Sequence, residues 1–249
     1  MTVKKKLGII GGMGSRAGAC FLQKIIDYSP ATSDQEFLEI IYHNNAAIPD
    51  RTRAIVYNEP SPIDAILRSV DLFNRNGIEV ITLGCITSYY YYRQITEHTS
   101  AYVINPLHLI FESIKEDYAG ALRIGILATT GTINSGLFHQ ELGSNGLDII
   151  TLSHHDQENL FMRSVYMKNG FKSAHISQEA RDLMKRSIDK LSEQQVDLII
   201  GGCTEVSVAI SPDVVDFPYI DTLDLLAKRT VDYCYNLEKI NYLKEWIRK

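Results

Sequence analysis

Two of the four cysteines, Cys85 and Cys203, stand in matching surroundings. Each comes directly after an apolar run that ends in glycine, and each is followed by hydroxyl residues, Thr87 and Ser88 in one case and Thr204 in the other. Serine and threonine are favoured at helix N-caps, so a helix is predicted to begin at each place. The positive end of a helix dipole and the free backbone N–H groups there lower the pKa of a thiol. We therefore expect both cysteines to be able to act as bases.

A matched pair of cysteines suits one kind of reaction in particular. If two thiols face opposite sides of one tetrahedral carbon, a thiolate on one side can remove a proton and the thiol on the other side can return one. The two groups exchange roles when the substrate has the other hand. This pattern favours racemisation or epimerisation. The remaining cysteines, Cys20 and Cys234, lie inside helical patterns without a turn or cap, and we expect them in the core.

An internal repeat indicates how the two cysteines could meet. Three pairs of landmarks are separated by nearly the same distance along the chain: Gly8 and Gly125 by 117 residues, Cys85 and Cys203 by 118, and Asn105 and Asp221 by 116. A duplicated unit of this kind predicts two lobes related by an approximate two-fold axis. Ligands of open parallel sheets bind outside the carboxyl ends of the strands, which is where both cysteines are predicted to lie.

Short apolar runs alternate with longer amphipathic stretches, a pattern typical of an α/β fold with parallel sheets. The predicted strands are Lys6–Ile10, Phe37–His43, Val80–Leu83, Ala101–Ile104, Arg123–Leu127, Asp148–Thr151, Asp197–Ile200 and Pro218–Ile220. The predicted helices are Ala17–Tyr28, Pro62–Asn76, Leu107–Tyr118, Glu158–Met167 and Gln178–Gln194. We expect two pseudo-symmetric lobes, each a parallel sheet flanked by helices, with the active site in the cleft between them. Residues 1–103 and 217–249 would form lobe 1, with Cys85 and Arg51, and residues 104–216 would form lobe 2, with Cys203 and the Thr129–Thr132 loop.

Composition excludes several other classes of protein. With 249 residues, 45% of them hydrophobic, and a net charge of −5, the chain offers no basic surface for nucleic acid. The basic start, Met1–Lys6, precedes an apolar stretch too short for a signal peptide, and no run of about 18 apolar residues could span a membrane. We therefore expect a cytoplasmic protein. No C-x-x-C pair and no cluster of cysteine and histidine has the spacing of a zinc site, so no metal is expected.

The glycine turn after the first predicted strand has two interpretations. Gly12-x-Gly14-x-x-Ala17 fits the dinucleotide-binding pattern G-x-G-x-x-A. A dinucleotide site also needs an acidic residue at the end of the second strand, where this chain has His43-Asn44-Asn45. No P-loop pattern occurs either. We expect no nucleotide cofactor.

Motifs distributed through nearly the whole chain resemble those of the PLP-independent aspartate/glutamate racemase family. They are Gly11–Gly14, Ser29–Ala31, Asp34–Glu36, Asn44–Asn45, Ile48–Thr52, Leu127–Thr132 and Gly202–Ser207. The glycine turn alone is a weak signal, but I-P-D-R-T at Ile48–Thr52 combined with G-C-T-E at Gly202–Glu205 is specific. The chain is therefore identified as a member of that family on its residues.

The resemblance implies a two-lobed homodimer that needs no cofactor and holds a small acidic amino acid between its two cysteines. It places Arg51 on the substrate's side-chain carboxylate, which suits the bidentate geometry of a guanidinium; a surface arginine after a Pro-Asp turn is the alternative. Hydroxyl and N–H donors for the α-carboxylate would come from the Thr129–Thr132 loop and Thr204. The substrate-binding residues implied in all are Met13, Asn45, Arg51, Thr87, Thr129, Thr130, Thr132, Lys168 and Thr204.

The surroundings of the first cysteine depart from the family pattern. Where the family typically has P-C-N-T-A-H, this chain has Gly84-Cys85-Ile86-Thr87-Ser88-Tyr89, so Ile86 replaces an asparagine that helps to hold the α-carboxylate. The run Tyr89–Tyr92 is also unusual, and one of its tyrosines is expected to reach the pocket. The tyrosines and the N-terminal stretch suggest the branch that supplies D-aspartate-type units to nonribosomal peptides such as microcystin.

Aspartate racemase is the first interpretation, with glutamate or a β-substituted aspartate as alternative substrates. Another reaction on the same scaffold, of the malonate decarboxylase or maleate isomerase type, would also use a cysteine beside a carboxylate pocket. A catalytically inactive binding protein is the third interpretation, because Ile86 replaces a polar residue of the site. Racemisation would exchange the α-hydrogen with solvent, the other reactions would give other products, and a binding protein would do neither.

Overall fold

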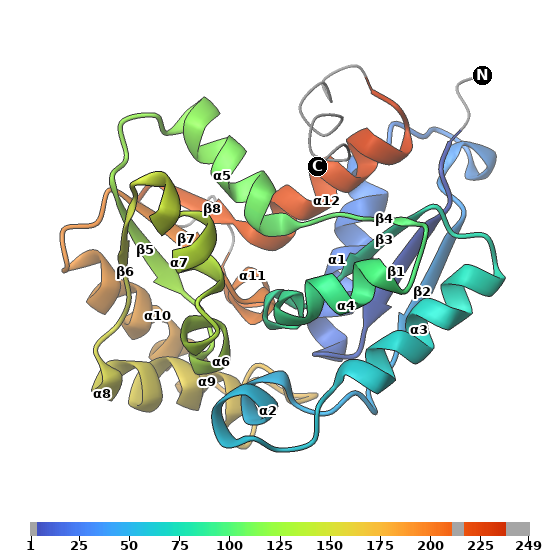
Figure 1. Ribbon diagram of the computed structural model, residues 1–249. Coiled ribbons are helices and arrows are strands. Elements are labelled where there is room, and N and C mark those ends of the chain that lie inside the picture. Colours follow the sequence, from blue (N-terminus) through green and yellow to red (C-terminus); the bar gives the residue numbers. More distant parts are fainter. Residues whose placement is uncertain (1–3, 211–216, 238–249) are drawn as a thin grey trace.

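The computed structural model describes residues 4–210 and 217–237, which contain two four-stranded parallel sheets flanked by helices (Figure 1). The strand order is β2-β1-β3-β4 in the first sheet and β6-β5-β7-β8 in the second. The strands are β1 (Leu7–Gly11), β2 (Ile40–Asn44), β3 (Val80–Leu83), β4 (Tyr102–Val103), β5 (Arg123–Leu127), β6 (Asp148–Ile150), β7 (Leu198–Gly201) and β8 (Tyr219–Asp221). All eight predicted strands are present, and the expected α/β class with two similar lobes is confirmed.

The two sheets share their register as well as their order. Leu7 pairs with Val80 in the first sheet, and Ile124 pairs with Leu198 in the second, as the repeat predicts. Equivalent glycines allow a helix to approach the central strand of each sheet: a Cβ at Gly8 would lie 2.7 Å from the ring of Phe73. The central strands β1 and β3 are buried along their whole length, as is usual for parallel strands covered on both faces.

Four of the predicted long helices occur close to their expected positions. They are α1 (Ser15–Tyr28), α3 (Ile63–Arg75), α5 (Pro106–Asp117) and α10 (Gln178–Ser192). The helix predicted over Glu158–Met167 is divided into α8 (His154–Asp156), a π-helical turn (Gln157–Met162) and α9 (Arg163–Tyr166). The pattern around Cys234 forms α12 (Thr222–Cys234).

The remaining helices are too short to leave a periodic pattern in the sequence. They are α2 (Arg51–Tyr57), α4 (Tyr92–Glu97), α6 (Thr130–Asn134), α7 (Leu137–Glu141), α11 (Thr204–Ala209), and the 3₁₀ turns Asp34–Glu36, Ile86–Tyr91 and Gly143–Asn145. Several of them carry residues of the site described below.

The expected boundary between the lobes at residue 217 is wrong for β8. This strand pairs with β7 through Ile200 and Ile220, so it belongs to the second sheet. The chain returns to lobe 1 only with α12, which packs against α1 and α5 above the two sheets in the view of Figure 1. The reason is that α12 places its apolar face, including Leu226, in one core with Phe21 of α1. The parts of the predicted lobes at residues 1–3, 211–216 and 238–249 lie outside the described residues.

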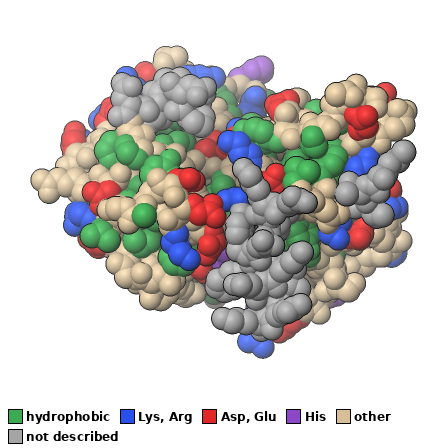
Figure 2. All heavy atoms as spheres, turned by 90° about the horizontal axis from the view of Figure 1, so that it is seen from above, with side chains coloured by type: hydrophobic (Ala, Val, Ile, Leu, Met, Phe, Trp, Pro, Cys, Tyr) green, Lys and Arg blue, Asp and Glu red, His purple; other side chains and the backbone are tan. Residues whose placement is uncertain are grey.

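Apolar side chains cover both faces of each sheet. Cys234 is fully buried in the cluster between α12 and the first sheet, and Cys20 packs against the same cluster. Both cysteines therefore lie in or against the core, as predicted. Lys and Arg side chains are interspersed with Asp and Glu on the face that Figure 2 shows. Within residues 4–210 and 217–237, no helix has the length and apolar character needed to cross a membrane.

Candidate active site

Cys85 and Cys203 occupy equivalent places at the carboxyl ends of β3 and β7. Cys85 is the N-cap of the 3₁₀ turn Ile86–Tyr91, and Cys203 is the N-cap of α11. Both have extended backbone, with φ of −160° and −138°. The predicted threonine caps are therefore wrong by position: Thr87 and Thr204 lie inside the first turn, and the cysteines themselves stand at the helix starts.

Both cysteines line a single pocket between the lobes. The space inside it is small, about 250 Å³ including the part that is open to solvent. Cys85 is 6% exposed and Cys203 is 5% exposed, so both thiols are similarly buried. The residues that line the pocket are Met13, Arg51, Thr52, Cys85, Ile86, Thr87, Thr129, Tyr166, Lys172, Cys203, Thr204 and Glu205.

Arg51 is the first residue of α2, and its side chain is buried in this pocket. Its Nη1 donates to Pro49 O at 3.0 Å and its Nη2 donates to Met13 O. Its Nε is buried and has no hydrogen-bond partner among the described residues. Burial alone would lower the pKa of Arg51, but the charges of Cys85 and Asp50 raise it above its ordinary value. The side chain is therefore a fixed cation with a free donor, and the alternative of a surface arginine is wrong.

Three hydroxyl groups form a closed cluster across the two lobes. Thr87 Oγ1 of lobe 1 lies 3.1 Å from Thr129 Oγ1 and 2.8 Å from Thr132 Oγ1, which are themselves 3.0 Å apart. Thr129 is the N-cap of α6 and accepts from the backbone N–H of Thr132. A Cβ at Gly131 would lie 2.7 Å from the Cα of Thr52, so this glycine lets α6 pack closely against α2. The loop of lobe 2 is thereby held against lobe 1.

A chain of charged groups lies beside Cys203. The thiol donates to Glu205 Oε2 at 2.9 Å, and Glu205 Oε1 accepts from Lys172 Nζ at 3.1 Å. Burial would raise the pKa of Glu205 and lower that of Lys172, but the attraction between them lowers the first and raises the second. Both groups are therefore charged in the neutral range.

The lowered pKa expected for Cys203 is wrong. Burial and the adjacent Glu205 carboxylate raise the pKa of this thiol well above its usual value. The helix that begins at Cys203 has only six residues. Its dipole is outweighed because a full negative charge stands at hydrogen-bond distance from the sulfur.

Four of the predicted site residues, Asn45, Thr130, Thr132 and Lys168, do not line the pocket. Lys168 is exposed in the turn after α9, where Gly170 N donates to Met167 O at 2.8 Å and reverses the chain. The lysine that reaches the pocket is Lys172. The Asn45 amide donates to Ala65 O and Ser69 Oγ, and the Thr130 hydroxyl donates to Glu158. Thr132 contributes only through the hydroxyl cluster.

The pocket also contains residues that sequence reasoning did not assign to it. Glu205 lies inside the G-C-T-E motif, and its position two residues after Cys203 is the signal that could have identified it. Tyr166 and Lys172 carried no such signal, because tertiary contacts bring them to the pocket. Tyr166 is the last residue of α9, and its OH donates to Asp50 Oδ2 of lobe 1 at 3.0 Å. Thr52 directly follows Arg51 in the motif at the start of α2.

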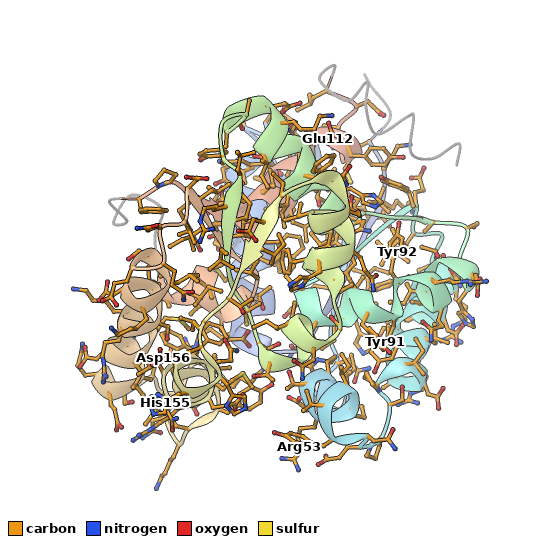
Figure 3. The ribbon with its side chains drawn as sticks, turned by 60° about the vertical axis from the view of Figure 1, so that its left-hand side comes forward. Arg53, Tyr91, Tyr92, Glu112, His155 and Asp156 are labelled. Carbon is orange, nitrogen blue, oxygen red and sulfur yellow. The ribbon has the colours of Figure 1, made fainter. Side chains whose placement is uncertain are left out.

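The expectation that a tyrosine of the run Tyr89–Tyr92 reaches the pocket is wrong. Tyr89 is buried in the core, and its hydroxyl accepts from Leu83 N. Tyr90 is 51% exposed. Tyr91 and Tyr92, where the 3₁₀ turn passes into α4, can be located in Figure 3. A 3₁₀ turn has three residues per turn, so the run points in several directions, none of them into the pocket.

Among the described residues, no group of three or more His, Cys, Asp or Glu side chains could hold a metal ion. The polar groups that face the pocket are instead two cations, one carboxylate, two thiols and a set of hydroxyls. This arrangement can bind a small anionic molecule and move a proton to or from it.

Comparison with known proteins identifies the class to which this fold and site belong. The model of the Asp/Glu/Hydantoin racemase family matches residues 10–230. The chain therefore belongs to the Asp/Glu/hydantoin racemase family, whose members are racemases that act without pyridoxal phosphate.

Individual relatives cover nearly the whole chain. The broad specificity amino-acid racemase RacX of Bacillus subtilis is 28% identical over 230 residues, which make up 90% of this chain and 96% of that protein. The structure of Picrophilus torridus aspartate racemase covers 93% of this chain and 94% of its own, with 25% identity and a TM-score of 0.79. Glutamate racemase of Francisella tularensis, solved with D-glutamate, shares the fold, with 15% identity, a TM-score of 0.65, and coverage of 94% and 81%.

Proposed function

We propose that this chain interconverts the L and D forms of aspartate, or of a closely related acidic amino acid, by proton transfer at Cα. The observation that carries the proposal is one buried pocket with Cys85 and Cys203 at equivalent strand ends and with Arg51, whose buried Nε has no partner. A cation with a free donor suits a carboxylate, and two thiols suit a proton exchange between two faces. The aspartate racemase from Picrophilus torridus supports this substrate class.

The two cysteines divide the reaction between them. One sulfur, as thiolate, takes the α-proton, and the electron pair of the C–H bond stays on Cα as a carbanion. The other sulfur, as thiol, gives its proton to the opposite face of that carbon and becomes a thiolate. Atoms and charge balance without a cofactor. Cys85 approaches from lobe 1 and Cys203 from lobe 2, so the substrate lies in the pocket that both line.

Arg51 binds the side-chain carboxylate of the substrate in this proposal. Pro49 O and Met13 O hold two of its nitrogens in place, which leaves the buried Nε–H available to an oxygen of the ligand. Because the guanidinium is already fixed, little conformational entropy is lost when the substrate binds.

The hydroxyl cluster and Thr204 bind the α-carboxylate. Thr87 and Thr129 line the pocket, and Thr132 joins both of them. Negative charge grows next to this carboxylate as Cα loses its proton, and hydroxyl donors in a site with little water stabilise such charge strongly. Ile86, 1% exposed, replaces the family asparagine with an apolar wall, so the α-carboxylate depends on the hydroxyls instead of an amide.

The experiment is chiral analysis of L-aspartate incubated with the purified protein, without pyridoxal phosphate or metal. We expect D-aspartate to form, and to form at least about 100-fold more slowly in the Cys85→Ser and Cys203→Ser variants. The matched control is Cys20→Ser, because Cys20 lies outside the pocket. The same analysis on glutamate, substituted aspartates and neutral amino acids tests the substrate class; equal rates on neutral amino acids would contradict it. Decarboxylated or isomerised products would indicate the alternative reactions, and no product with tight binding would indicate a binding protein.

Further expectations concern where and with what the protein works. We propose a homodimer in the cytoplasm, as the resemblance implies. Light scattering of the purified protein tests the first part: a mass near twice the 28.1 kDa of one chain supports it, and a monomer contradicts it. A role in supplying D-aspartate-type units to nonribosomal peptides stays a prediction.

A further inference from the structure

We infer that Glu205 holds Cys203 as a thiol, so that Cys85, which lines the same pocket with Arg51, takes a proton in the free enzyme and Cys203 gives one. The assignment of acid and base rests on the proposed racemase function. The order in which the two thiols ionise does not, and it can be measured without any substrate.

The proton of Cys203 is fixed by its contact with Glu205. Sγ donates to Oε2 at 2.9 Å, and the same oxygen lies 3.4 Å from the hydroxyl of Thr204. Glu205 is 3% exposed, and its other oxygen accepts from Lys172. Ionisation of Cys203 would therefore place two negative charges at hydrogen-bond distance in a buried site, where their repulsion is weakly screened.

The surroundings of Cys85 carry the opposite charge. Arg51 lines the same pocket as this thiol, and attraction to Cys85 helps to keep the pKa of the buried guanidinium above its ordinary value. Among the described residues that line the pocket, Glu205 is the one carboxylate, and it contacts Cys203. A thiolate beside an arginine is stabilised by direct attraction. The two cysteines thus stand at equivalent strand ends, with Arg51 in the pocket on the side of lobe 1 and Glu205 in contact with Cys203.

Each sulfur also faces other titratable groups, and they do not remove this contrast. Tyr219 lies near Cys203 and Tyr89 near Cys85, and burial raises the pKa of both phenols, so both are neutral in the working range. The Lys172 ammonium acts on both sulfurs. The difference that remains is Arg51 on one side and Glu205 on the other.

This polarity has a consequence for turnover. After Cys85 takes the α-proton and Cys203 gives its own, the product leaves an enzyme with a thiol at Cys85 and a thiolate beside Glu205. The enzyme must then return to its first form by moving a proton from Cys85 to Cys203, directly or through solvent. The L and D forms have equal free energy, so kcat/KM has the same value for conversion of L to D and of D to L. The different ionisation of the two thiols is then expected to make kcat differ between the two directions, and KM to differ with it.

The test is alkylation by iodoacetamide across a pH series, with each cysteine followed by peptide mass spectrometry. Because the two cysteines are 6% and 5% exposed, a difference in rate reports ionisation more than access. We expect Cys85 to react about tenfold or more faster than Cys203 near pH 7.5, which is the ratio that one unit of difference in pKa produces. Faster reaction of Cys203 in the unaltered protein would overturn the inference by itself.

The variant Glu205→Gln keeps the size of the side chain and removes its charge. We expect the alkylation of Cys203 to accelerate about tenfold, with its pH profile moved to lower pH, and that of Cys85 to stay within about twofold. Glu179→Gln is the control, because Glu179 pairs with Arg163 at the surface and should change neither rate. An unchanged Cys203 profile in a folded Glu205→Gln protein would contradict the role of Glu205.

The outcomes separate this inference from the proposed function. If the predicted order of alkylation is found but no amino acid is racemised, the charge assignment stands and the function is wrong. If aspartate is racemised but Cys203 reacts first, the function stands and the polarity is wrong.

Discussion

The two lobes are alike in geometry and different in charge. They share strand order, register and the position of a cysteine after the third strand of each sheet. Their contributions to the pocket nevertheless differ, because lobe 1 supplies Arg51 and lobe 2 supplies Lys172 and Glu205. The repeat therefore explains why two thiols meet, whereas the residues that were not repeated determine which thiol keeps its proton.

Removing either sulfur tests the geometric likeness of the lobes and should have the largest effect. Cys85→Ser and Cys203→Ser should each reduce kcat about 10²–10⁴-fold. The pKa of a serine hydroxyl is too high for it to ionise and act as the base. Each variant keeps one competent sulfur, so each should still take the α-proton of one enantiomer and eliminate the leaving group of a β-substituted aspartate, and the two variants should prefer opposite hands. The rate of elimination from each pure enantiomer measures this. Two variants that act on the same enantiomer would show that the cysteines are not on opposite faces.

Replacing Arg51 tests the charge that lobe 1 contributes. Arg51→Lys should lower kcat/KM for aspartate about 10- to 100-fold, because an ammonium cannot both keep the contacts to Pro49 O and Met13 O and offer a donor to the carboxylate. A charged hydrogen bond is worth about 1.5–3 kcal/mol. Steady-state kinetics measure the loss. The matched control is Arg53→Lys in the same helix, since Arg53 is exposed and pairs with Glu59; it is labelled in Figure 3. Equal kinetics for the Arg51 and Arg53 variants would remove Arg51 from the site.

The hydroxyl cluster sharpens the comparison because it spans both lobes. Thr132→Val keeps the shape of the side chain and removes the hydroxyl that joins Thr87 to Thr129. A neutral hydrogen bond contributes about 0.5–1.5 kcal/mol, so kcat/KM should fall about 2- to 12-fold. Thr96→Val is the control, since Thr96 lies on α4 away from the pocket. A loss confined to thermal stability, with unchanged kinetics, would assign the cluster a structural role only.

The smallest effect concerns acid stability. The pKa of Glu205 is lowered, because attraction by Lys172 exceeds the opposing effect of burial. A group with a lowered pKa in the folded state adds stability above its unfolded pKa, about 4.3, and this contribution is lost as pH falls through the lower folded value. Urea unfolding at several pH values below about 5 should therefore show a steeper loss of stability in the parent than in Glu205→Gln. Identical slopes would contradict a folded state that keeps Glu205 ionised.

Much of the fold follows from the sequence because buried parallel strands are continuous apolar runs. All eight strands and the repeat could be predicted, and the repeat alone brings Cys85 and Cys203 to one pocket. Short helices such as α2 and α7 could not, since fewer than two turns leave no periodicity. Lys168 was chosen instead of Lys172 because the path of the loop after α9 depends on tertiary contacts.

The charge state of Cys203 shows a different limit. The helix start was predicted within one or two residues, but the position of the Glu205 carboxylate relative to the sulfur depends on how the first turn of α11 directs its side chain. A dipole spread over a short helix is weaker than one full charge at hydrogen-bond distance. Local sequence therefore identified the reacting atom and missed the group that controls its proton.

The central claim, proton exchange between two faces of Cα by two different sulfurs, is tested most directly by the isotope in each enantiomer early in the reaction. L-aspartate with protium at Cα is incubated with the protein in deuterium oxide. After a few per cent conversion the two enantiomers are separated, and the deuterium content of each is measured by mass spectrometry. A thiol carries one proton, so return to the original face restores protium, while the other sulfur delivers deuterium. The account predicts that the D-aspartate formed carries deuterium and the L-aspartate that remains keeps protium. Deuterium entering the remaining L-aspartate as fast as D-aspartate forms, or D-aspartate formed with its protium retained, would contradict it.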